Sequence, residues 1–89
     1  MRAEIDAVDS NILSLFAKRH ALSQAIVQAK DVEHASIRDE ARERALIKQR
    51  IVEGRQLGLE AHFITKLFHE IIGESVRLQQ DFLQNKLNS

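Results

Sequence analysis

One spacing constrains the fold of this chain more than any other feature of its sequence. Between residues 5 and 29, eight positions follow one another at alternating intervals of three and four residues. They are apolar with one exception, and comprise Ile5, Val8, Ile12, Leu15, Arg19, Leu22, Ile26 and Ala29. This heptad pattern is typical of an α-helix that packs along its length against another helix. It predicts a single helix from about residue 2 to the low 30s.

A helix of this length does not fit into a compact monomer of 89 residues. At 1.5 Å per residue it spans roughly 45 Å, whereas the radius of gyration of a domain of this size is about 12 Å. The first helix therefore protrudes unless a second chain covers it. The sequence thus predicts an intertwined homodimer.

The remainder of the chain also favours helices. It contains no Pro, and its three Gly all lie in the second half. A polar stretch predicts a break before Ser36, and Ser36 with Asp39 resembles a capping box at the start of a second helix. This helix is expected to end at about Val52 or Glu53, with Gly54 and Gly58 around its C-terminal turn.

A third helix is expected from about Glu60 to the mid 80s. Gly73 lies in its middle, where it lowers helix propensity by about 1 kcal/mol relative to Ala; we attribute it to the close approach of another helix or a ligand. The chain is therefore expected to be all-α, with three helices in a single domain over residues 1–89. The inward stripe of the third helix comprises Ile64, Leu67, Phe68, Ile71, Ile72, Ser75, Leu78, Gln79, Phe82 and Leu83.

Composition excludes several classes of function. Thirteen basic residues balance thirteen acidic ones, and the only aromatic residues are four Phe, so no nucleic-acid partner is expected. The chain has no Cys and no apolar run that could span a membrane, which indicates a soluble, cytoplasmic protein. It also has no Gly-rich phosphate loop, no paired metal-ligand motif and no Ser with a neighbouring base. We therefore expect neither a metal nor a cofactor.

Polar side chains occupy positions where the helical patterns call for apolar ones. Arg19 stands in the heptad seam, and Lys30 follows eleven residues later on nearly the same side of the helix. Two long cations placed in this way could hold one small anion between them. Alternatively, Arg19 sets the register of a coiled coil, or both side chains extend to water. For Arg19 taken alone, this alternative is the better explanation.

The second and third helices show the same feature. Asp39, Arg42 and Glu43 share one face of the second helix, which Leu46, Ile47 and Arg50 continue. The alternative is ion pairing on a solvated face. Ser75 and Gln79 lie one turn apart within the apolar stripe of the third helix. A pair of this kind could equally serve to bond neighbouring helices.

Three helices with inward polar groups together describe a charged pocket in a helical bundle. The net positive charge of the pocket favours a small anion, and more than one carboxylate would suit the number of cations. Arg2 lies about 25 Å before Arg19 along the same helix. It could reach a ligand held by Arg19 only from the partner chain of an antiparallel dimer.

With these residues identified, the chain resembles the all-helical chorismate mutases. The resemblance is greatest to the mutase domain at the N-terminus of bifunctional chorismate mutase–prephenate dehydratases. It rests on Arg2, IDAVD at 5–9, LFAKR at 15–19, Lys30, IRDEARER at 37–44 and ESVRLQQ at 74–80.

The resemblance implies a domain-swapped homodimer of three-helix chains with two equivalent active sites. It also implies the Claisen rearrangement of chorismate to prephenate, on the route to phenylalanine and tyrosine, without metal or cofactor. A fused prephenate dehydratase or dehydrogenase domain in the full-length protein is compatible with it.

The resemblance also implies a role for each pocket residue. Arg19, with Arg2 from the other chain, would clamp the two carboxylates of chorismate. Lys30 and Gln79 would donate to the ether oxygen, where negative charge grows as the C–O bond breaks.

The other four residues would complete the pocket. Glu43 would accept a hydrogen bond from the ring hydroxyl, aided by Asp39, while Arg42 and Ser75 would line the pocket and assist the carboxylates. Two alternatives are an isochorismate-pyruvate lyase of the same fold, and a non-catalytic helical module that dimerises or senses an anion. The module would make Lys30 and Gln79 dispensable.

Overall fold

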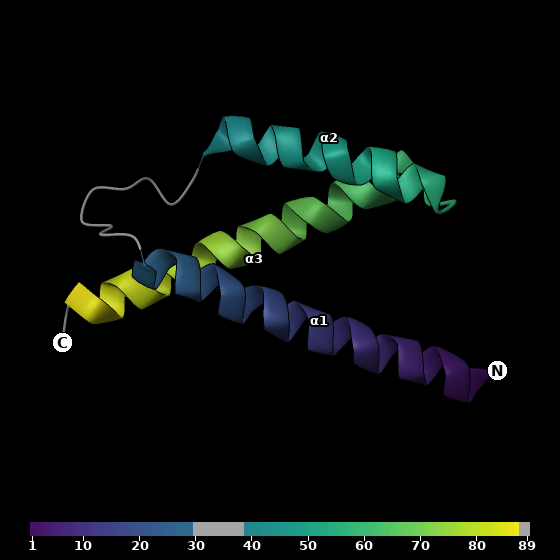
Figure 1. Cartoon of the computed structure of the whole chain (residues 1–89), viewed down its shortest axis with the longest axis horizontal. Coiled ribbons are helices and arrows are strands. Elements are labelled where there is room, and N and C mark those ends of the chain that lie inside the picture. Colours follow the sequence, from purple (N-terminus) through teal and green to yellow (C-terminus); the bar gives the residue numbers. More distant parts are fainter. Residues whose placement is uncertain (30–38, 88–89) are drawn as a thin grey trace.

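Three helices make up the described part of the chain. The structure is a computed structural model that describes residues 1–29 and 39–87. Its elements are α1 (Arg2–Ala29), α2 (Glu40–Gln56) and α3 (Ala61–Leu87), as Figure 1 shows. The prediction of an all-α fold with three helices and a very long first helix is confirmed over these ranges. None of the helices within them is long and apolar enough to cross a membrane.

Asp39 caps the N-terminus of α2. Its backbone is extended, and its side chain accepts a hydrogen bond of 3.0 Å from the backbone N–H of Arg42. A carboxylate at this position also interacts favourably with the helix dipole. The prediction that the helix starts from Ser36 is therefore wrong, because Asp39 satisfies the free N–H groups three residues later. Ser36 itself lies outside the described residues.

A Schellman motif ends α2 and leads into α3. The backbone N–H groups of Gly58 and Leu59 donate to carbonyls in the last turn of α2, at 3.0 and 2.9 Å. This arrangement needs a left-handed residue, and Gly58 supplies it with φ of 85°. The predicted position of Gly54 and Gly58 around this turn is confirmed. The helix itself continues to Gln56, slightly beyond its predicted end.

The core lies between α2 and α3. Ile47 of α2 packs with Ile72 and Val76 of α3, and all three are buried. The predicted inward stripe of α3 is confirmed, since every one of its members is buried or half-buried. The residues that pack against this core from its edge are Leu46, Ile51 and Phe68.

The two helical glycines have different surroundings. A Cβ at Gly54 would meet the side chain of Ile64, with Cγ1 at 3.0 Å, so α2 and α3 approach closely there. A Cβ at Gly73 would meet nothing within 4 Å in the described part of the chain. Within the described chain the close approach of two helices is therefore found at Gly54, at the tight end of the α2–α3 hairpin, and the approach of a ligand to Gly73 stays a prediction.

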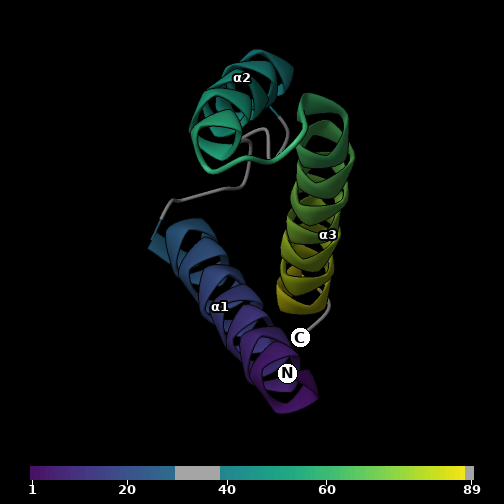
Figure 2. The same cartoon turned by 90° about the vertical axis from the view of Figure 1, so that its right-hand side faces the viewer.

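Within the described residues, only the second half of α1 packs against the other helices. Figure 2 shows α3 extending from α2 to α1. Arg19 of α1 donates a hydrogen bond to α3, and Ser23 of α1 accepts one from it. Every residue from 1 to 15 is exposed. The molecule is accordingly 48 Å long with a radius of gyration of 15.5 Å, well above the value of about 12 Å expected for a compact domain of this size.

The heptad seam of α1 is uncovered in the single chain. Its exposed large side chains are Ile5, Val8, Ile12, Leu15, Leu22 and Ile26, each between 43% and 65% exposed. The side of α1 that loses exposure is instead centred on Phe16, His20, Ser23 and Val27. One side of α1 therefore packs against α3, and a second, apolar side is exposed to solvent.

Candidate functional site

Arg19 of α1 and Ser75 of α3 form the centre of the candidate site. The guanidinium Nη1 of Arg19 donates to the Ser75 hydroxyl at 2.6 Å. Ser75 is the one buried polar residue in the described part of the chain, at 8% exposure, and Arg19 is half-buried. The contact explains why a cation and a hydroxyl interrupt two apolar stripes, since each satisfies the other.

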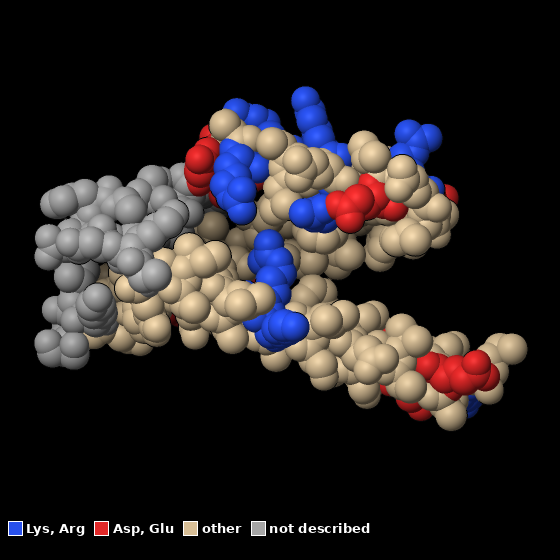
Figure 3. All heavy atoms as spheres, viewed as in Figure 1, with Lys and Arg blue, Asp and Glu red and all other residues tan. Residues whose placement is uncertain are grey.

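Other cations surround Arg19. Burial lowers the pKa of the Arg19 guanidinium from its ordinary value, and the positive charges of Arg50 and then Arg42 lower it further. Figure 3 shows Lys and Arg side chains on α1 and around α2, some of them where the two helices face each other and others on the outer side of α2. An anion bound between the two helices would relieve this repulsion. The electrostatics therefore favour a ligand with one or more negative charges.

Gln79 lies one turn beyond Ser75 and also contacts α1. Its amide Nε2 donates to the hydroxyl of Ser23 at 2.7 Å and lies 3.3 Å from the Ser23 main-chain oxygen. Both Arg19–Ser75 and Ser23–Gln79 join residues that are 56 positions apart in the chain. The two contacts therefore join α1 and α3 at two successive helical turns, and we call them the Arg19–Ser75 and Ser23–Gln79 rungs. Gln79 lies on α3 one turn beyond the residue that binds Arg19.

The first turn of α2 holds three further predicted site residues. Asp39 uses its carboxylate to cap the helix through the backbone N–H of Arg42. Glu43 is half-buried and donates its backbone N–H to the Asp39 carbonyl at 2.9 Å. The Arg42 side chain is exposed, although its charge acts on Arg19. Arg42 therefore lines the open side of the site in the single chain rather than its interior.

Of the two remaining predicted site residues, one lies apart from this group and the other is outside the described residues. Arg2 is exposed in the first turn of α1, at the end that projects away from α2 and α3 (Figure 1). Within one chain it is therefore separated from Arg19, as its position in the sequence required. Lys30 lies outside the described residues, so its place beside Arg19 stays a prediction.

The site is open in the single chain. Figure 3 shows the molecule hollowed between α2 and the N-terminal half of α1. A separate surface hollow of about 410 Å³ is lined by Ile51, Val52, Arg55 and Gln56, and none of these is a predicted site residue. The lining of this hollow offers a single cation and no residue of α1, whereas the hydrogen bonds and further cations lie around Arg19.

The sequence did not identify two residues of this arrangement. Ser23 holds Gln79, but a Ser on a helix surface is too common to be singled out. Arg50 was placed on the inward face of α2 without being assigned to the site. It pairs with Glu53 and, of the two neighbouring cations, has the larger effect on Arg19. Arg50 lies one turn beyond the apolar residues Leu46 and Ile47, on the same face of α2, and this position indicates that its side chain faces the site.

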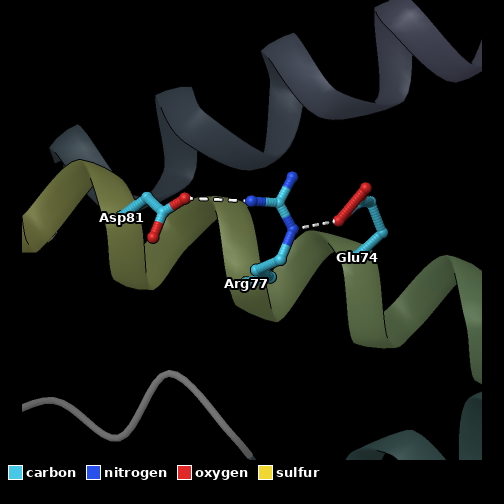
Figure 4. Close-up of polar contacts among 3 residues, drawn as sticks. All are labelled: Glu74, Arg77 and Asp81. Carbon is cyan, nitrogen blue, oxygen red and sulfur yellow. Dashed lines mark hydrogen bonds and ion pairs between the residues drawn. The ribbon is translucent and has the colours of Figure 1, made fainter.

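A second group of charges lies on the exposed side of α3. Figure 4 shows Arg77 between Glu74 and Asp81, with its Nε donating to Glu74 and its Nη1 to Asp81. The hydrogen bond from Arg77 lowers the pKa of the Glu74 carboxyl. These three side chains pair with one another along one helix and are well solvated, so they stand apart from the site.

The arrangement is suited to binding and to electrostatic stabilisation. Arg19, Arg42 and Arg50 provide positive charge, and Gln79 provides a neutral donor at a fixed position. No group of three or more His, Cys, Asp or Glu side chains that could hold a metal ion occurs among the residues described. The described groups can therefore fix a small anion in one conformation and favour charge that develops on it.

Comparison with known proteins gives one consistent result. The model of the family described as chorismate mutase type II matches residues 1–80. The chain is 47% identical over 88 residues to the bifunctional chorismate mutase/prephenate dehydratase of Enterobacter agglomerans, with 99% of this chain and 23% of that protein covered. The protein of the same name from Escherichia coli strain K12 is 42% identical over the same length.

A more distant relative has a different name. The T-protein of Haemophilus influenzae is 29% identical over 89 residues, which is 24% of its length. The chain thus spans less than a quarter of the curated relatives it matches. The similarity concerns this one segment of them and all three helices of the chain.

Proposed function

The chain belongs to the type II chorismate mutase family, and we propose that the site around Arg19 and Gln79 rearranges chorismate to prephenate in an intertwined, domain-swapped homodimer. As a chorismate mutase the chain is an isomerase of aromatic amino acid biosynthesis. The observation that carries the proposal is the pair of rungs that sets Arg19 and Gln79 side by side among further cations.

The first step of the mechanism is the binding of the substrate in its reactive shape. Arg19 and Arg2 of the partner subunit each hold one carboxylate of chorismate, so the ends of the molecule that must bond are brought together. The reaction is intramolecular, and confinement of this kind removes a large part of the entropic barrier. The half-buried position of Arg19 supports the assignment, because partial desolvation strengthens a charge-assisted hydrogen bond.

The second step is the stabilisation of charge in the transition state. As the C–O bond lengthens, negative charge grows on the ether oxygen, and Lys30 and Gln79 donate hydrogen bonds to it. These interactions are stronger in the transition state than in the ground state, which is the condition for a higher rate. The fixed amide of Gln79 supports this assignment.

The remaining residues orient the substrate. Glu43 accepts from the ring hydroxyl, and Asp39 acts by capping the turn that carries Glu43 and Arg42. Arg42 assists a carboxylate from the open side of the site. Ser75 acts through its hydrogen bond to Arg19. No covalent intermediate is involved, so the site requires no nucleophile.

Support for the dimer comes from α1. Six large apolar side chains of its heptad seam are exposed in the single chain, and each of its first 15 residues is exposed. A second α1 that lies antiparallel along the seam would cover these side chains and bring its Arg2 toward the site. The hollow between α2 and α1 in Figure 3 leaves room for it.

For the protein as a whole, three further points are proposals. Residues 1–89 form a single mutase domain, the reaction takes place in the cytoplasm, and a prephenate dehydratase or dehydrogenase domain accompanies the mutase in the full-length protein. The first and third are supported by the relatives, whose names combine the two activities and of which the chain matches less than a quarter.

The proposal is tested by incubation of the protein with chorismate, with its absorbance followed and the product identified. We expect chorismate to be consumed with formation of prephenate. Formation of pyruvate from isochorismate, with chorismate unchanged, would instead indicate a lyase. Failure of the folded dimer to convert either compound would contradict the proposed activity and leave an anion-binding module.

A further inference from the structure

The contact between Gln79 and Ser23 determines which way the Gln79 amide points. Nε2 lies 2.7 Å from the Ser23 hydroxyl and 3.3 Å from the Ser23 main-chain oxygen. A main-chain oxygen can only accept a hydrogen bond, so the nitrogen of the amide and not its oxygen must face Ser23. The opposite orientation would set two oxygens against each other. The contact therefore fixes the donor end of this side chain.

We propose that Ser23 is a positioning residue for Gln79 in the rearrangement; this rests on the proposed function of Gln79 as a donor to the ether oxygen. An amide nitrogen carries two N–H groups. Both acceptors of Nε2 are oxygens of the single residue Ser23. One N–H shared between these two oxygens leaves the second directed away from Ser23 by the planar geometry of the amide. That second N–H is the one that donates to the substrate.

The position of Ser23 suits this role. It lies on α1 one turn after Arg19, and the Arg19–Ser75 rung fixes the two helices directly beside it. A Gln side chain has three rotatable bonds, and without a partner it would sample several rotamers. With Ser23 present, the donor is in place before the reaction starts, and no reorganisation is needed in the transition state.

The same feature predicts which kinetic constant changes. Gln79 interacts with the ether oxygen mainly in the transition state, whereas the affinity for chorismate depends on the cations that hold its carboxylates. Loss of Ser23 should therefore lower kcat and leave KM nearly unchanged. We expect Ser23→Ala to lower kcat about three- to tenfold, which corresponds to the loss of one neutral hydrogen bond.

The test uses three variants besides Ser23→Ala. Ser10→Ala is the matched control, because Ser10 is exposed on the same helix, opposite the heptad seam. Ser23→Thr retains the hydroxyl and should restore most of kcat. Gln79→Ala should lower kcat about a hundredfold or more. In the Gln79→Ala background, Ser23→Ala should have no further effect, since there is no amide left to position. Helical content by circular dichroism is measured for every variant.

Two results would overturn the inference and leave the proposed function standing. One is a Gln79→Ala variant of low kcat together with a Ser23→Ala variant of normal kcat. The other is a Ser23→Ala effect of equal size with and without Gln79, which would show a general structural role. A Gln79→Ala variant of normal kcat would instead remove the proposed role of Gln79, and the inference about Ser23 with it.

Discussion

At the level of single residues, two of the groups assigned to the substrate are each held by a serine of the facing helix. Arg19 is held by Ser75, and Gln79 is held by Ser23, so each of α1 and α3 supplies one active group and one supporting serine. Asp39 supports the first turn of α2 in the same way. A supported side chain loses little entropy when substrate binds, which favours both affinity and rate.

One residue-level prediction concerns Glu74, which lies next to Ser75 but on the solvated side of α3. The hydrogen bond from Arg77 lowers the pKa of the Glu74 carboxyl below its ordinary value. The interaction therefore stabilises the fold above the ordinary pKa of a glutamate and is lost as the pH falls through the lowered value. A titration of the Glu74 carboxyl carbon by NMR should report this lowered pKa directly.

Two variants control this measurement. Arg77→Gln should raise the pKa of Glu74 toward its ordinary value, because it removes the charged guanidinium whose Nε donates to Glu74. Lys66→Gln removes the same charge from an exposed position two turns before Glu74 and should leave the pKa nearly unchanged. Equal changes in the two variants would show that net charge, and not the Arg77 hydrogen bond, sets the value.

Some residues of the candidate site can be predicted from the sequence, and others cannot. Arg19, Ser75 and Gln79 are visible in the sequence because a polar residue in an apolar stripe must be satisfied when buried. Ser23 gives no such signal, since α1 carries its apolar pattern on a different side. Asp39 was placed correctly near the start of α2, but Ser36 fits a cap equally well, and sequence preference alone cannot choose between them.

At the level of helices, the glycines of α2 and α3 provide a matched comparison. Gly54→Ala would set a methyl group against the buried Ile64 side chain, whose own exposure is 2%. Overpacking of this kind costs about 1–3 kcal/mol, which outweighs the gain of up to about 1 kcal/mol in helix propensity. We expect a net destabilisation of about 1 kcal/mol, measured by chemical denaturation at one fixed protein concentration.

Gly73→Ala is the control, because the same change is made where a Cβ would meet nothing within 4 Å in the described structure. The gain in propensity then acts alone, and the variant should be stabilised by about 0.5–1 kcal/mol. If Gly54→Ala were as stabilising as Gly73→Ala, the tight contact between α2 and α3 at Gly54 would not exist in solution.

The elements themselves follow from the sequence more fully than their contacts do. A heptad seam, an apolar stripe and the two glycines of a C-terminal turn predict three helices with nearly the observed bounds. The pattern on α1, however, belongs to a surface that this chain leaves exposed. The side of α1 that meets α3 carries only Phe16 and Val27 as large apolar residues. The stronger heptad pattern on the other side therefore prevents this contact side from being recognised in the sequence.

At the level of the whole molecule, the chain is extended because α1 has a side that no part of the described chain covers. The free N-terminal half of α1 carries Arg2 and borders the hollow between α1 and α2 (Figure 3). A partner chain that covers the seam would therefore complete the site in the same step. In this account, dimerisation and activity have one structural cause.

The most direct test of this account is to mix two variants, Arg2→Ala and Arg19→Ala, each of which should be inactive alone. If Arg2 acts on the site of the partner subunit, a mixed dimer contains one intact site and one site that lacks both arginines. Random exchange of equal amounts should therefore restore about a quarter of the wild-type activity. Exchange is verified with two affinity tags. If verified mixed dimers recover no activity, the result would contradict active sites that combine Arg19 of one chain with Arg2 of the other.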